Sequence, residues 1–237
     1  MAFKKLTTPS LKEVFIQEIE NMILSGELNI GDKLPPEREL VETMGISLSV
    51  ITAGIADLEN KGFVEIRPRQ GIFVSDYIHK GSLETLVSIM RYNNGKLNNR
   101  EVRSMIETRI VLEQLTVRSV IERGSDADIK ALAKYFDLLK KEKDSEAAAN
   151  TVLDFFHAMS ILSDNILLPL LYHSFRAPMV GMYNRFVEQN GIEPVYETAY
   201  TLYQYVLARD KDKAEAWVDT YLRKVIEGNS SIICLTD

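Results

Sequence analysis

The sequence predicts a mainly α-helical protein, in which a small winged helix-turn-helix domain is followed by an all-α helical bundle. Residues 34–74 contain two short helical patterns around a glycine, and two short β-rich runs come after them. Beyond Asp76 the strand signals stop, and apolar residues recur at helical spacing. We therefore expect a first domain at residues 1–76, a linker at 77–82 and a helical domain at 83–237.

The composition is that of a globular protein without a membrane segment. The chain has 237 residues, of which 46% are hydrophobic and 26% are charged. No apolar run approaches the roughly 18–20 residues that cross a bilayer, and the N-terminus lacks the apolar core of a signal peptide. The single cysteine, Cys234, excludes an internal disulfide framework. We expect a cytoplasmic protein that has no membrane partner.

The first helix is expected at residues 9–26. Ser10 can cap its N-terminus, isoleucines at positions 16, 19 and 23 mark one apolar face, and Gly26 follows the last turn. The next segment, LNIGDKL, is a short connector that can contribute a small strand.

Two helices joined by a tight turn come next. Two prolines precede the first helix, where a missing N–H costs nothing. Gly45 breaks the pattern where a turn between crossing helices needs it. Ser47 can cap the second helix by accepting a bond from a free backbone N–H. In that second helix an apolar stripe is formed by Ile51, Ile55 and Leu58.

Two β-rich runs, FVEIR and GIFV, complete this domain, with Pro68, Arg69 and Gln70 in the turn between them. This order of elements is typical of a winged helix-turn-helix, which places its second helix in a DNA major groove. The charge alone does not support DNA binding, because the net charge is -6 and residues 1–78 hold 8 Lys and Arg against 12 Asp and Glu. Any basic footprint must be local, at Arg38, Arg67 and Arg69, with Lys4, Lys5 and Lys12 as further candidates.

The remainder of the chain is helical in period. Turn residues such as Gly124-Ser125-Asp126 and Asn190-Gly191 separate its helices, and Pro169 and Pro178 should kink or divide one of them. We expect helices at about 82–94, 98–123, 126–142, 145–163, 166–189, 194–209 and 211–228.

Two groups of motifs resemble a known family. LPPEREL, a Gly-Ile-Ser helix start, LENKGFV and RPRQGIFV resemble the GntR family of bacterial transcription regulators. Glu107-Thr108-Arg109 with Glu113, and Asp154-Phe-Phe-His157 on a later helix, look like the FCD effector domain of the FadR subfamily. The resemblance implies a regulator rather than an enzyme. It also implies a homodimer that reads a palindromic DNA operator and holds a small-molecule effector in its helical domain.

The recognition helix departs from the family pattern, which usually begins Ser-Arg-Thr-Thr-Val-Arg. Here the run is Ser-Leu-Ser-Val-Ile-Thr, from Ser47 to Thr52, and both arginines are missing. Arginine is the commonest reader of guanine, so the loss implies a different operator or weaker direct readout. Val50 and Ala53 can instead touch thymine methyl groups. The DNA-contacting residues that we expect are Arg38, Ser47, Ser49, Val50, Thr52, Arg67, Arg69, Gln70 and Gly71.

Many FCD domains bind a divalent metal through one aspartate and three histidines. This chain has three histidines, of which His79 falls in the linker. The positions of the later two family histidines fall near Ala199 or Tyr200 and at Tyr221, and none of these is a usual ligand. Asp154 and His157 form at most half a site, which binds metal weakly. We expect no metal and no other cofactor.

The later helices instead hold many aromatic residues, which can line a ligand cavity or form an ordinary core. Arg109 occupies the Glu-x-Arg position that the family directs into its cavity, and an arginine there suits a carboxylate. The resemblance leaves two effector classes open, a small organic acid and an acyl-CoA. The candidate effector-binding residues are Arg109, Asp154, His157, Tyr172, Arg176, Tyr183, Tyr200 and Tyr221.

Two other functions stay open at this point. The missing arginines and the acidic first domain are compatible with a degenerate regulator that senses a ligand without specific DNA binding. A metal-dependent enzyme could use Asp154 and His157, but the sequence shows no nucleophile–base pair, phosphate loop or nucleotide fingerprint to support it.

Overall fold

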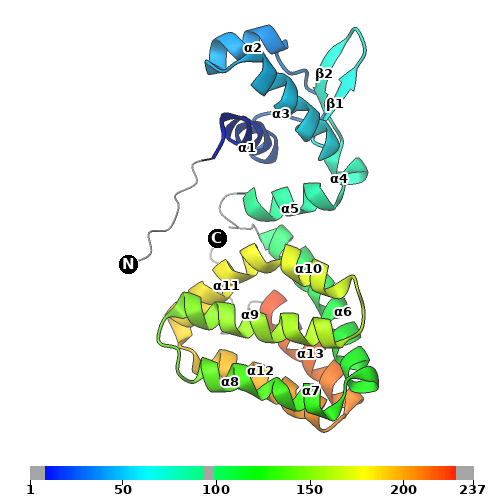
Figure 1. Cartoon of the computed structure of the whole chain (residues 1–237), viewed down its shortest axis with the longest axis vertical. Coiled ribbons are helices and arrows are strands. Elements are labelled where there is room, and N and C mark those ends of the chain that lie inside the picture. The colour runs from blue at the N-terminus through cyan, green and yellow to red at the C-terminus, as the bar shows by residue number, and fades with distance from the viewer. Residues whose placement is uncertain (1–8, 93–98, 228–237) are drawn as a thin grey trace. The chain divides into compact units, whose positions relative to one another are not determined.

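A computed structural model describes residues 9–92 and 99–227 in two compact units, Met1–Asn93 and Asn94–Asp237 (Figure 1). Cys234 and the expected helix ends near residues 94, 98 and 228 lie outside the described residues. Within these residues no single helix is long and apolar enough to cross a membrane. One bent pair, the second and third helices of the chain, meets the test by length and composition only.

The first unit contains the expected winged helix-turn-helix. Helix α1 spans Leu11–Leu24, α2 spans Glu37–Met44 and α3 spans Leu48–Asn60. Ser10 caps α1 as predicted, because its hydroxyl accepts the Glu13 N–H and the Glu13 carboxylate accepts the Ser10 N–H. The apolar faces of all three helices meet in one core, which also contains Phe63.

The close approach of α1 to α3 depends on Gly54. A Cβ atom at this position would lie 2.7 Å from Cε1 of Phe15 and closer still to Cδ1. The Phe15 ring is buried, so it has little room to move. A glycine that weakens an isolated helix is therefore the residue that lets the two helices pack.

The wing is a two-stranded antiparallel sheet of β1, Val64–Arg67, and β2, Gly71–Val74. Val64 pairs with Val74 and Arg67 pairs with Gly71, which fixes a three-residue turn at the tip. The connector before α2 adds only an isolated bridge between Lys33 and Phe73. Main-chain bonds from Leu34 N–H to the Ile72 carbonyl and from Val74 N–H to the Asp32 carbonyl hold it there.

The boundary between the units falls later than residues 77–82, where the sequence suggested a linker. That segment contains a short helix, α4 at Tyr77–Lys80, and the next helix, α5 at Leu83–Arg91, also belongs to the first unit. The buried Thr85 hydroxyl of α5 donates to the main-chain carbonyl of Lys61, the C-cap of α3. This bond ties α5 to the recognition helix.

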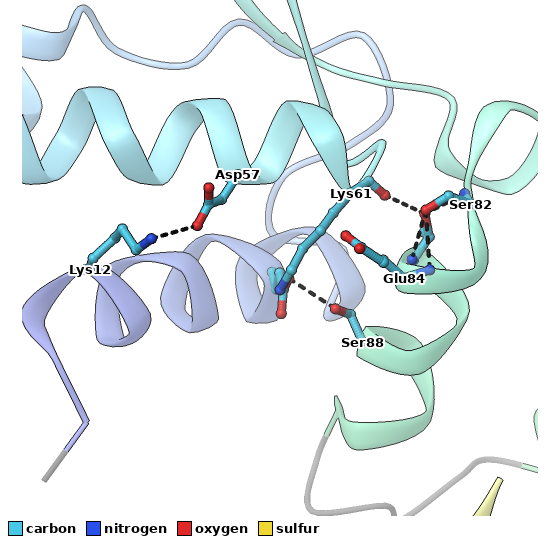
Figure 2. Close-up of polar contacts among 8 residues, drawn as sticks. Lys12, Asp57, Lys61, Ser82, Glu84 and Ser88 are labelled. Carbon is cyan, nitrogen blue, oxygen red and sulfur yellow. Dashed lines mark hydrogen bonds and ion pairs between the residues drawn. The ribbon is translucent and has the colours of Figure 1, made fainter. Parts of the chain in front are cut away.

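A second polar connection joins α5 to α1. The Ser88 hydroxyl donates to the Glu20 carboxylate at 3.0 Å, and the Lys61 ammonium lies 2.8 Å from the same oxygen. Lys12 and Asp57 form a further ion pair between α1 and α3 (Figure 2). Because Ser88 and Thr85 are buried, these bonds fix α5 against the helix-turn-helix.

The described part of the second unit is all-helical, as predicted. Its long helices are α6, Asn99–Arg123; α9, Ser145–Leu162; α11, Arg176–Asn190; α12, Glu193–Leu207; and α13, Lys211–Ile226. Helix α6 packs against α13, and α9 packs against α11. The expected helix at 126–142 is divided into α7, Asp126–Ala131, and α8, Ala133–Leu139.

The expected helix at 166–189 is also divided, into α10, Leu168–Ser174, and α11. The break falls at Phe175, between the two prolines that predicted a kink or a division. Pro169 and Pro178 each lie in the first turn of a helix, where a proline breaks no hydrogen bond.

Candidate functional site

The turn between α2 and α3 has the geometry of a helix-turn-helix. The two helices are bent by 116°. Gly45 follows α2 with a φ of 66°, in the left-handed region that glycine adopts without strain, and its N–H donates to the Val41 carbonyl. The turn presents the N-terminus of α3 at the surface.

The first two turns of α3 expose a face without charge. Leu48, Ser49, Thr52 and Ala53 are exposed, and Leu48 keeps 48% of its surface. Val50 is half-buried, and the first ionisable side chain of the helix is Asp57, in its third turn. This exposed face is therefore composed of methyl groups and hydroxyls.

The hydroxyls on this face are paired within the protein. Ser47 stands at the N-cap, but its side chain makes no capping bond, so that expectation was wrong. Its hydroxyl lies 3.0 Å from the Ser49 hydroxyl instead. The Thr52 hydroxyl donates to the Glu37 carboxylate of α2 at 3.3 Å.

The three candidate arginines differ in the contacts that they make within the protein. Arg67 lies 4.2 Å over the Phe73 ring and donates to Glu65 at 2.6 Å, a contact that lowers the pKa of Glu65. Arg69 occupies the wing tip with a φ of 64°, and Arg38 is exposed on α2. Neither Arg38 nor Arg69 has an ion pair with another described residue. Gln70 is exposed beside Arg69, and Gly71 is half-buried at the start of β2.

The second unit holds a buried polar cluster in the middle of its bundle. Arg109 and Glu113, one turn apart on α6, form an ion pair in which Glu113 is fully buried. The Arg109 guanidinium also donates to the Tyr183 hydroxyl at 2.8 Å and lies 4.9 Å over the Phe156 ring. The Tyr221 hydroxyl donates to the other Glu113 oxygen. Four helices therefore converge on one charge pair.

Burial controls the ionisation of this cluster. Burial raises the pKa of the Glu113 carboxyl, while Arg109 and the Tyr221 hydroxyl act in the opposite direction. Burial alone would lower the pKa of Arg109, but Glu113 and the neighbouring tyrosines raise it, so the guanidinium stays charged. Burial raises the pKa of Tyr172, Tyr183 and Tyr221, which keeps these hydroxyls neutral.

Two small apolar cavities flank Arg109 and Phe156. The first is lined by side chains of α6, α9, α11, α12 and α13, including Thr198 and Tyr221. The second is lined by side chains of α6, α9, α10 and α11, including Tyr172. Each has room for about one or two water molecules in this conformation, so an organic ligand has to move the lining side chains apart.

The structure brings four of the eight candidate effector-binding residues together, namely Arg109, Tyr172, Tyr183 and Tyr221. The other four line neither cavity. Asp154 pairs with Arg176 at 2.8 Å, and His157 lies beside His173 with ring centres 6.5 Å apart. Tyr200 stacks on Tyr196 with ring centres 5.3 Å apart. On α9 the cavity face belongs to Val152, Leu153 and Phe156 instead.

The candidates predicted from the sequence did not include Glu113 and Phe156, although Glu113 stands four residues after Arg109 and so faces the same side of α6.

The described residues do not fit a metal. No group of three or more His, Cys, Asp or Glu side chains within them could hold an ion. Tyr221, at one of the family's histidine positions, bonds to Glu113 instead.

The comparisons with known proteins agree with both units. The model of "Bacterial regulatory proteins, gntR family" matches residues 11–74, and that of the FCD domain matches residues 104–224. The chain is 28% identical to the HTH-type transcriptional regulator Mce2R of Mycobacterium tuberculosis over 177 residues, 75% of this chain and 73% of the relative. It is 26% identical to the HTH-type transcriptional repressor NanR of Citrobacter rodentium over 237 residues, 94% and 86% of the two chains.

A solved structure described by the words "Lar controls the expression of the Listeria monocytogenes agr system" has the same fold. Its TM-score is 0.63 at 14% sequence identity, and the match covers 94% of this chain and 97% of that one.

Proposed function

The chain belongs to the gntR family of bacterial regulatory proteins and carries an FCD domain, and on this premise we propose how it binds DNA and its ligand. It is a ligand-responsive, DNA-binding transcription regulator and not an enzyme. We propose that it binds a palindromic operator as a homodimer, with one α3 in the major groove of each half-site.

The DNA contacts divide into two kinds. Arg38 and Arg69 are exposed cations without an ion pair in the described part of the chain, so they suit DNA phosphates. Arg67 joins them if DNA draws it away from Glu65. Ser49, Val50 and Thr52 stand at the N-terminal turns of α3, which in this kind of module face base edges. Ser47, Gln70 and Gly71 contribute at the edges of this surface.

The homodimer rests on apolar surface in the second unit. Val111 and Leu115 are exposed one turn apart on α6, and Ile166, Leu167 and Leu170 are exposed at and before the start of α10. Exposed apolar groups of this kind are typical of an interface between protein chains. A native mass spectrum of the purified protein should therefore be dominated by the dimer.

The ligand is proposed to be an organic acid with an apolar body. The observation that carries this proposal is the buried Arg109, which lies between two apolar cavities. Glu113 accepts from Nε of Arg109, so a ligand carboxylate can make a bidentate contact with the Nη1 and Nη2 groups while its body enters a cavity. A small organic acid needs less rearrangement than an acyl-CoA.

Two experiments test these proposals. Duplex DNA from upstream of the protein's own coding region should be retarded in a gel at low salt, with two protected half-sites in a footprint. No retardation at any protein concentration would instead support the hypothesis that the protein senses a ligand without binding DNA specifically. For the ligand, native mass spectrometry should detect a co-purified acid, which Arg109→Met should lose and Arg185→Met, on the exposed side of α11, should retain.

A further inference from the structure

The uncharged face of α3 has a consequence for the DNA that it can select. Leu48, Thr52 and Ala53 expose methyl groups on the first two turns, and no cation accompanies them. Thymine is the base that presents a methyl group in the major groove, whereas guanine presents two acceptors that need a donor such as arginine. We propose that this recognition helix selects thymine through the C5-methyl group, a specificity that rests on the DNA binding proposed above.

The polar groups near this face act against guanine. Ser47 and Ser49 bond to each other, and the Thr52 hydroxyl is directed at Glu37. The Glu37 carboxylate accepts the Thr52 proton, so this hydroxyl is not free to donate to the N7 and O6 acceptors of guanine. Apolar contact with thymine needs none of these hydroxyls and leaves their bonds intact.

The arrangement separates affinity from specificity. Arg38 on α2 and Arg69 at the wing tip provide the phosphate contacts on either side of α3, so the helix need not hold the DNA by itself. The side chains with the most exposed apolar surface stand at the N-terminal end of α3, where base contacts are made. Ala56, one turn after Thr52, is also exposed and lies farther from that end.

The test begins with the full-length protein and a random duplex library. The recovered half-sites should carry a thymine at fixed positions, and each of these thymines is then replaced by deoxyuridine, which removes only the methyl group. Each contacted methyl should account for about a fourfold loss of affinity, and the symmetric pair for about sixteenfold. Deoxyuridine outside the half-sites should leave the affinity unchanged.

A pair of variants assigns the contact to α3. Ala53→Gly removes a methyl group from the reading face, so one deoxyuridine substitution should lose most of its effect in this variant. Ala56→Gly has the same cost in helix propensity and should leave the deoxyuridine effects as they are in the parent protein. If guanines define the half-sites, or if deoxyuridine leaves the affinity unchanged, the proposed selection of thymine is overturned, whereas the operator binding is not. No enrichment of any sequence would overturn both this inference and the proposed operator binding.

Discussion

Replacement of Gly54 by alanine tests the packing that positions the recognition helix. In an exposed helix this change stabilises a protein by about 1 kcal/mol, because alanine has the higher helix propensity. Here the new Cβ would lie 2.7 Å from Cε1 of the buried Phe15 ring. Overpacking of this kind costs roughly 1–3 kcal/mol. The net effect should therefore be a loss of about 1 kcal/mol in the first unit.

The single tryptophan makes the measurement specific. Trp217 lies on α13, so its fluorescence follows the second unit, whereas amide exchange of α1 and α3 follows the first. Gly54→Ala should reduce exchange protection in α1 and α3 and leave the urea midpoint of Trp217 fluorescence unchanged. Gly181→Ala is the matched control, because its Cβ meets only Arg185 Nη1 at 3.9 Å. That variant should gain about 1 kcal/mol in the fluorescence transition. A stabilised first unit in Gly54→Ala would refute the close approach of α1 and α3.

Two further predictions concern buried polar groups, and a third concerns bound metal. Thr85→Val should cost the first unit about 1–3 kcal/mol in amide exchange, since the Lys61 carbonyl loses its donor, and Thr85→Ser should restore most of the loss. Arg109→Met should reduce the free energy of unfolding of the second unit by roughly 3–5 kcal/mol at pH 7, because it leaves Glu113 buried without a cation. Burial already raises the Glu113 pKa above its ordinary value of 4.5, and loss of Arg109 raises it further. The folded state then binds the proton more tightly than the unfolded chain. The loss of unfolding free energy in Arg109→Met should therefore be smallest below pH 4.5 and grow as the pH rises. A loss that grows on acidification would contradict this assignment. Treatment with a chelator should leave the Trp217 transition unmoved, and a lowered midpoint would reveal a metal that contributes to the fold.

The elements of the fold could be predicted because their signals are local. Ser10 with Glu13, Gly45 in the turn, and the prolines in the first turns of α10 and α11 act within four residues of themselves. The domain boundary could not be predicted in the same way. Thr85 reaches Lys61, 24 residues earlier, and Ser88 reaches Glu20, 68 residues earlier. Nothing in the local pattern of α5 indicates partners so far away in the chain.

The lining of the proposed ligand cavity could be predicted only in part. Arg109 follows from its motif, but the choice among the aromatic residues depends on which face of each helix turns inward. On α9, Asp154 and His157 lie one residue away from the cavity-lining Leu153 and Phe156, and this offset of about 100° turns them out of the cavity.

Of the two candidate sites, α3 is the more informative. Its exposed positions are fixed by the fold, since Ile51, Gly54 and Ile55 are buried and leave only one face of the helix exposed. The character of that face then follows directly from the sequence, which has no ionisable side chain between Leu48 and Ala56. In the second unit, by contrast, the cavity walls must move before a ligand can enter. The residues that line the cavity in this conformation therefore indicate the charge and the polarity of the ligand but not its shape. The structure therefore constrains the DNA half-site of this regulator more narrowly than it constrains the ligand.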